Sequence, residues 1–162
     1  MKIIAIAITV AILLVVGIFY YVLKNKSTEV ADKMPYSAIL NKQLVTKTEA
    51  FILKIDPNVS NLKENVLKHD SSVVFGEQLL CKVPQGAILN ISKAIHYTKS
   101  VSGITYSLLI GKVWIQELKK EIEFEYQWGE HHFLCVEEPC NYWTFPQAIW
   151  QETADSTKYF YN

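Results

Sequence analysis

The sequence predicts a mainly β fold that follows an N-terminal transmembrane helix, with a small antiparallel barrel or sandwich and one or two short helices in its body. Three observations lead to this prediction: a long uncharged run at the start, strict alternation of polar and apolar residues later, and turn signals between the alternating runs. We therefore divide the chain into an anchor over 1–26, a juxtamembrane linker over 27–34 and one globular domain over 35–162.

The uncharged run covers residues 3–23, where Thr9 and Gly17 are the only residues that are neither apolar nor aromatic. A helix of about 20 such residues spans the hydrocarbon core of a bilayer. A cleaved signal peptide is the alternative, but its apolar core is shorter and precedes a small-residue cleavage site, which 18–23 lacks. The run predicts a single-pass signal-anchor that contacts the lipid bilayer through residues 3–23.

The lysines around this run bear on the side of the membrane that the domain faces. Lys24, Lys26 and Lys33 follow the run, which favours a cytoplasmic domain under the positive-inside rule. A very short N-terminal tail before a long apolar run is instead typical of an anchor whose C-terminal part is exported. We expect the exported side, periplasmic or extracellular, and keep the cytoplasmic side as the alternative.

The clearest strand covers residues 121–128, where polar and apolar residues alternate without a fault. Alternate side chains of a strand face opposite sides, so we expect four apolar residues inside and three Glu in water. Apolar residues also recur at every second position over 87–97 and over 104–110. This pattern shifts at Gly111, which indicates a bulge or a sharp bend. Further strands are expected over 50–55, 73–83 and 142–150, the last weakened by Pro146.

A short helix is expected after Pro35, because Pro is tolerated at the first helical position and Tyr36, Ile39, Leu40 and Leu44 recur at helical spacing. Residues 61–69 fit a short helix or a loop equally. The turn at 84–86, a strand, the turn at 102–103 and a second strand resemble an SH3-type barrel in layout, without a diagnostic motif.

Composition excludes one class of partner. The chain has sixteen Lys, no Arg and a formal net charge of zero, whereas proteins that read nucleic acids are usually basic and rely on Arg. We expect no nucleic-acid binding. Carboxylates outnumber lysines over 117–138, which indicates either solvated strand faces or an acidic patch for a basic partner.

One cluster of metal-binding residue types stands out: His131, His132, Cys135 and Cys140. Zinc prefers Cys and His ligands, but structural sites usually have two closely spaced pairs, and adjacent His on a strand face opposite ways. A disulfide between Cys135 and Cys140 is better motivated in an exported domain, with two free thiols as the alternative. Cys81 is expected to be a buried, small apolar residue.

Signatures of catalysis are missing from the sequence. It has no Gly-x-Ser-x-Gly elbow and no Gly-rich phosphate loop, and the carboxylates of 121–125 are expected in a row on the solvent face. We expect a protein that is not an enzyme and uses no cofactor and no metal.

Aromatic residues near the C-terminus have two interpretations. Packing in the core is the usual role of such residues, and an exposed face that binds a partner is the alternative. The candidate binding residues are Trp128, Tyr142, Trp143 and Trp150. The leading hypothesis is a membrane-anchored, non-enzymatic domain that binds another envelope protein or a peptide. The alternatives are a metal- or thiol-dependent envelope protein using His131, His132, Cys135 and Cys140, and a membrane-anchored toxin-neutralising protein.

Overall fold

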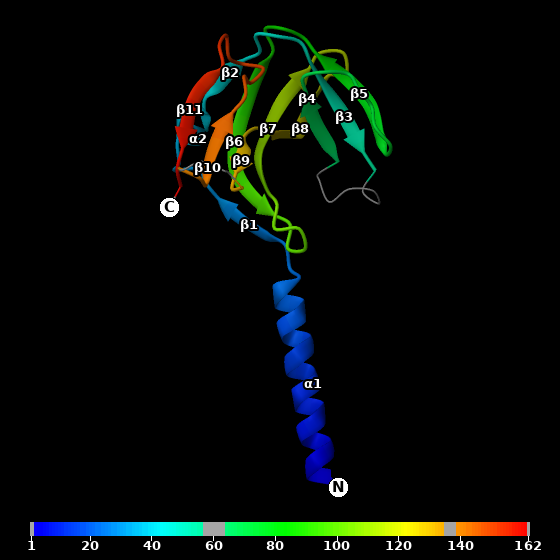
Figure 1. The fold of residues 1–162 in the computed structure, drawn as a ribbon. Coiled ribbons are helices and arrows are strands. Elements are labelled where there is room, and N and C mark those ends of the chain that lie inside the picture. Colours follow the sequence, from blue (N-terminus) through cyan, green and yellow to red (C-terminus); the bar gives the residue numbers. More distant parts are fainter. Residues whose placement is uncertain (1, 57–63, 135–138, 162) are drawn as a thin grey trace.

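The computed structural model describes residues 2–56, 64–134 and 139–161, with the side chains of the first helix described from residue 12 onward. Strands make up 47% of the protein and form two sheets, from which helix α1 points away (Figure 1). The mainly β prediction is therefore confirmed.

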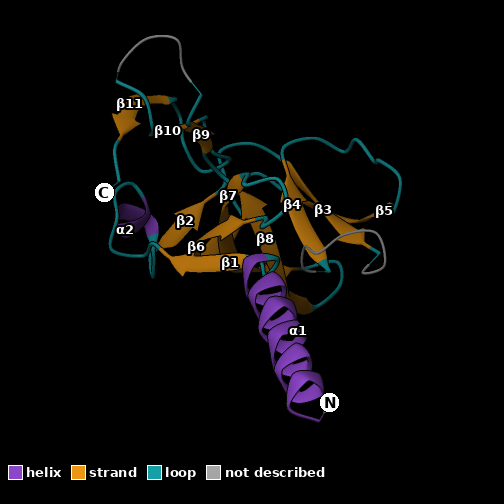
Figure 2. Ribbon diagram, turned by 60° about the horizontal axis from the view of Figure 1, so that its bottom comes forward, coloured by secondary structure: helices purple, strands orange, loops and turns teal. Residues whose placement is uncertain are grey.

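The larger sheet has eight strands in the order β1-β6-β7-β8-β4-β3-β5, with β2 also paired to β6. Their bounds are β1 Lys26–Glu29, β2 Gln43–Val45, β3 Ala50–Ile55, β4 Asn65–Lys68, β5 Glu77–Val83, β6 Ile88–Thr98, β7 Thr105–Ile115 and β8 Lys120–Gln127. The smaller sheet has the order β11-β10-β9, with β9 Glu130–His132, β10 Tyr142–Phe145 and β11 Asp155–Tyr159. The short helix α2, Tyr36–Ile39, lies near β2 at one side of the larger sheet (Figure 2).

The sheets do not close into a barrel, so the predicted barrel, and the SH3-type layout with it, is wrong. The larger sheet ends at β1 and β2 on one side and at β5 on the other, and no pairing among the described strands joins those edges. Antiparallel pairing is also not universal, because β4 runs parallel to β8 and meets it at the single pair Val66–Glu125.

Most of the predicted strands are present. Strand β3 covers the predicted residues, β6 and β7 form the expected long hairpin, and β8 turns Ile122, Phe124 and Tyr126 into the core. One detail of β8 is wrong: Glu125 is only 6% exposed, because β4 pairs alongside it. The irregularity expected at Gly111 lies on the partner strand, where the register shifts between Ile91 and Lys93 opposite that glycine.

The strands that the sequence did not predict lie in segments without a clear periodic pattern. Residues 27–34 were expected to be a linker, but strand β1 pairs with β6 from Lys26↔Thr98 to Glu29↔Ile95. Leu44, expected on a helix, lies in β2, and the ambiguous 61–69 segment contributes β4. The expected strand over 142–150 ends at Phe145, directly before Pro146. For β1, β2 and β4, pairing with a neighbouring strand supplies the order that the local pattern lacks.

Helix α1 covers Lys2–Val22. Where the structure describes the chain, no helix is both long enough and apolar enough to cross a membrane. The described residues therefore contradict the transmembrane helix over 3–23, and with it the expected single-pass membrane location and signal-anchor.

Candidate functional site

Three of the four aromatic residues predicted to bind a partner are buried. Trp128, Trp143 and Trp150 are 1%, 4% and 8% exposed, and Tyr142 is half-buried. The three tryptophans therefore pack in the core, and they do not form an exposed aromatic face.

Buried aromatic residues and the half-buried His96 form a seam between the two sheets, which we define as Tyr36, His96, Trp128, Trp143 and Phe145. The imidazole of His96 stacks on Trp143 with ring centroids 4.2 Å apart, and the edge of Tyr36 meets Phe145 at 5.4 Å and Trp128 at 6.2 Å. Trp128 donates a hydrogen bond from Nε1 to the carbonyl oxygen of Pro146 at 2.8 Å. These contacts join β6 of the larger sheet, α2 and β10 of the smaller sheet.

Burial shifts the pKa values of two polar groups in this seam. Desolvation, followed by the charge of His131, lowers the pKa of His96 to about 4. Desolvation raises the pKa of Tyr36 to about 12, although its hydroxyl lies 2.7 Å from Ser107 Oγ and 3.0 Å from His96 Nε2. Both groups are therefore neutral near pH 7, which is the form that a buried position favours.

Of the predicted metal cluster, His131 and His132 turn their rings to different partners. His131 Nε2 lies 2.9 Å from Asn141 Oδ1, and its ring stacks on Trp143. His132 Nε2 lies 2.8 Å from Thr144 Oγ1, and its ring stacks on Tyr142 instead. Within the described ranges no group of three or more His, Cys, Asp or Glu residues could hold a metal ion.

The two described cysteines differ in state. Cys140 is disulfide-bonded, whereas Cys81 is a free, buried thiol, as expected. Cys135, the predicted partner of Cys140, lies outside the described residues. The pairing of these two cysteines stays a prediction.

An exposed apolar row crosses three strands on the outer side of the larger sheet. Val45 of β2 lies opposite Ile88 of β6, and Leu89 lies opposite Val113, which places Ile88 beside Trp114 of β7. The exposed fractions of Val45, Ile88 and Trp114 are 45%, 48% and 56%. We call these three residues the Trp114 face. Trp114 is thus the exposed tryptophan among the four.

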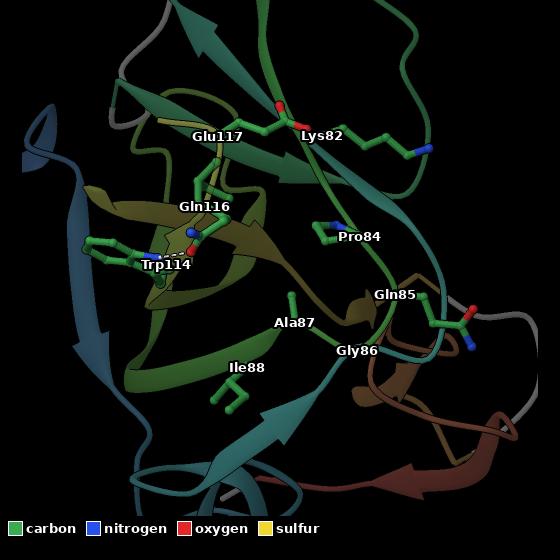
Figure 3. Close-up of a pocket in the computed structure, with 10 residues that line it drawn as sticks. Lys82, Pro84, Gln85, Gly86, Ala87, Ile88, Trp114, Gln116 and Glu117 are labelled. Carbon is green, nitrogen blue, oxygen red and sulfur yellow. Dashed lines mark hydrogen bonds between the residues drawn. The ribbon is translucent and has the colours of Figure 1, made fainter. Parts of the chain in front are cut away.

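A pocket of about 390 Å³ opens beside this face. Figure 3 shows Pro84, Ala87 and Ile88 on one side of it and Trp114 and Gln116 on the other. The indole nitrogen of Trp114 donates to Gln116 Oε1 at 3.1 Å, which fixes the ring at the rim. Ligand pockets usually enclose about 300–1,000 Å³ and combine apolar walls with a few polar groups, so this pocket is of a suitable size and lining.

One wall of the pocket is held by a buried threonine. Thr46, 1% exposed, donates from Oγ1 to the Pro84 carbonyl at 2.8 Å and accepts from the Ala87 N–H at 2.9 Å. Gly86 adopts a φ of 86°, which lets the turn reverse at no steric cost. The wall is therefore fixed before any ligand binds.

Two charged side chains, Lys82 and Glu117, line the same pocket. Lys82 Nζ lies 2.6 Å from Glu49 Oε1, and Figure 3 shows its ammonium pointing away from Glu117. Among the described residues, Glu117 forms no ion pair. Burial, and then the negative charge of Glu117, raise the pKa of the Cys81 thiol, which keeps that thiol protonated.

A second pocket, of about 410 Å³, lies where β4 meets β8. Its polar side chains bond to one another: Lys68 Nζ lies 2.7 Å from Glu77 Oε2, and His69 Nε2 lies 2.6 Å from Tyr126 Oη. Burial lowers the pKa of His69 and raises that of Tyr126. The His69–Tyr126 contact joins the end of β4 to β8, whereas the Lys68–Glu77 pair joins β4 to β5.

Comparison with known proteins finds no match: no protein-family model, no curated protein and no solved structure is similar to the chain. The functional conclusion therefore depends on the geometry of the Trp114 face and its pocket.

Sequence reasoning missed Trp114, although a signal for it exists. Trp114 alternates in step with Lys112 and Gln116, whereas the buried Val113 and Ile115 occupy the positions in between. A tryptophan on the same face of a strand as the polar residues points to solvent. This distinguishes Trp114 from the C-terminal aromatics. Val45 and Ile88 carried no such signal, because their exposure depends on how β2 and β6 pair.

Proposed function

We propose that this protein is a non-enzymatic binding domain that recognises a polypeptide through the Trp114 face. The observation that carries the proposal is an exposed tryptophan at the end of an apolar row, beside a pocket with a fixed wall. Tryptophan is enriched at the few positions that contribute most of the binding energy of protein interfaces. The support lies in the combination of the exposed indole with the apolar row and the pocket, and a partner that covers all three would remove them from water together.

The shape of the site favours a polypeptide over a small molecule. The apolar row extends from Trp114 across β6 to β2, beyond the pocket itself. A polypeptide segment can place one side chain in the pocket while the residues next to it cover Ile88 and Val45. A small molecule confined to the pocket would leave Val45 in water.

The test is selection of a displayed library of random peptides on the immobilised full chain, followed by affinity measurements with the selected peptides. We expect Trp114→Ala to weaken their binding at least tenfold, as truncation of a hot-spot residue does. Because the indole is exposed, the same change is expected to lower the free energy of unfolding by less than about 1 kcal/mol.

A matched control is Phe75→Ala, which removes an aromatic ring that is 90% exposed and does not line the pocket. This variant is expected to bind the selected peptides as the wild type does. Selection of no peptide, or of peptides that bind equally to Trp114→Ala, contradicts the proposal.

A further inference from the structure

We infer that the segment bound at the Trp114 face carries a bulky apolar side chain next to a Lys or Arg. This inference depends on the proposed function and specifies the chemistry of the partner. Three features of the described residues support it: the apolar walls of the pocket, the unpaired carboxylate at its edge, and the open ring face of the tryptophan.

The walls of the pocket determine the apolar part of the partner. Pro84, Ala87, Ile88 and Ile115 line it together with Trp114. A charged or amide side chain placed against these apolar groups would lose its hydration there, which is unfavourable. An aliphatic or aromatic side chain would instead remove the exposed surface of Ile88 and Trp114 from water.

The charges at the pocket determine the adjacent residue. Lys82 is already neutralised by Glu49 at 2.6 Å, which leaves Glu117 as the lining charge without a counter-ion among the described residues. Figure 3 places Glu117 at one end of the pocket, on the same side as Lys82. A cation of the partner next to the apolar side chain would pair with this carboxylate.

Neighbouring lysines do not cancel this preference. Lys120 lines a separate depression together with Lys54 and Glu64, and Lys119 lines neither. On the outer face, Lys112 Nζ is paired with Glu121 Oε2 at 3.1 Å. The local charge that a ligand meets inside the pocket is therefore that of Glu117.

The exposed indole adds a second attraction for a cation. Lys and Arg bind over the face of an aromatic ring, most strongly over Trp. Trp114 is 56% exposed and its Nε1 is occupied by Gln116, so the ring face remains the part of the side chain that a partner can cover. The carboxylate and the ring thus favour the same kind of residue.

The test applies the peptide library to three forms of the full chain: wild type, Glu117→Lys and Glu130→Lys. Glu130 lies exposed on β9 of the smaller sheet, so its substitution makes the same change in net charge without altering the pocket. We expect wild type and Glu130→Lys to select peptides with an apolar residue beside Lys or Arg, and Glu117→Lys to select Asp or Glu in that place. Peptides selected on the wild type should bind roughly fivefold more weakly to Glu117→Lys, and this difference should shrink at high salt.

The possible results separate the inference from the proposed function. If the selected peptides depend on Trp114 but carry no basic preference, or bind equally to Glu117→Lys, the inference is overturned and the proposed function stands. If their binding does not depend on Trp114, both fail. A loss of binding in Glu130→Lys as large as in Glu117→Lys would also overturn the inference, because net charge alone would then explain it.

Discussion

The four tryptophans occupy two contrasting regions of one molecule. In the seam between the sheets, Trp128 and Trp143 are almost completely buried and are surrounded by other rings. On the outer face of the larger sheet, Trp114 leaves more than half of its surface in water. Tryptophan therefore packs in the core in one region and remains exposed for binding in the other.

This difference shows that aromatic content does not by itself locate a binding site. The C-terminal aromatics are dense in the sequence because they connect the smaller sheet and α2 to the larger sheet. The tryptophan suited to a partner lies apart from them, on the polar face of β7. Substitutions in the two regions should consequently separate stability from binding.

The largest expected effect is on stability and comes from the seam. Trp128→Ala removes a 1%-exposed side chain and its hydrogen bond to Pro146, and we expect it to lower the free energy of unfolding by about 3–5 kcal/mol. Urea unfolding followed by circular dichroism measures this change. If Trp114→Ala costs as much as Trp128→Ala, the two regions do not differ in the way described.

The next effect is a pH dependence that arises in the same seam. The pKa of His96 is about 4 in the folded protein and about 6.5 when unfolded. Between these values the unfolded chain binds a proton that the folded one does not, so stability falls as the pH decreases from about 6.5 to about 4 and this contribution then levels off. We expect a loss of about 2 kcal/mol, reduced for partial exposure of the ring.

The measurement is urea unfolding at several pH values for the wild type and for His96→Gln. In the variant this part of the pH dependence should disappear. Because burial also lowers the pKa of His69, His69→Gln serves as the control and should retain most of it. A NMR titration in which the His96 imidazole protonates near pH 6.5 would contradict the prediction.

The sequence predicted the parts of the fold in which a local pattern coincides with burial. Ile122, Phe124 and Tyr126 alternate with polar residues and are buried as expected. Gly111 marked an irregularity, and a Cβ there would meet the Asn90 carbonyl at 2.9 Å, so the close approach of β6 explains the glycine. Both features are encoded within a few residues of the chain.

Features that depend on distant pairing were not predictable in this way. Strand β1 is exposed along its length and forms through its pairing with β6, and Glu125 is buried because β4 lies beside it. The open sheet follows from the order of strands rather than from any one strand. The Trp114 face likewise requires Val45 and Ile88, distant in sequence, to be neighbours.

The smallest expected effect separates Trp128 of the seam from the buried Trp150 that packs against it. Trp150 is 8% exposed, and its Nε1 is buried without a hydrogen-bond partner among the described residues, whereas Trp128 Nε1 donates to Pro146 at 2.8 Å. A buried, unsatisfied polar group costs about 1–3 kcal/mol, so Trp150→Phe removes an unfavourable group while losing some packing. We expect the free energy of unfolding of Trp150→Phe to stay within about 1 kcal/mol of the wild type.

Trp128→Phe is the matched comparison for this change, because it removes the same atoms from a ring that does use its N–H. It leaves the Pro146 carbonyl without that donor, and we expect it to cost about 2 kcal/mol or more. Urea unfolding of the two variants under one set of conditions gives the difference directly. Equal losses would mean that packing around the rings, rather than the indole hydrogen bond, determines how each tryptophan stabilises the protein.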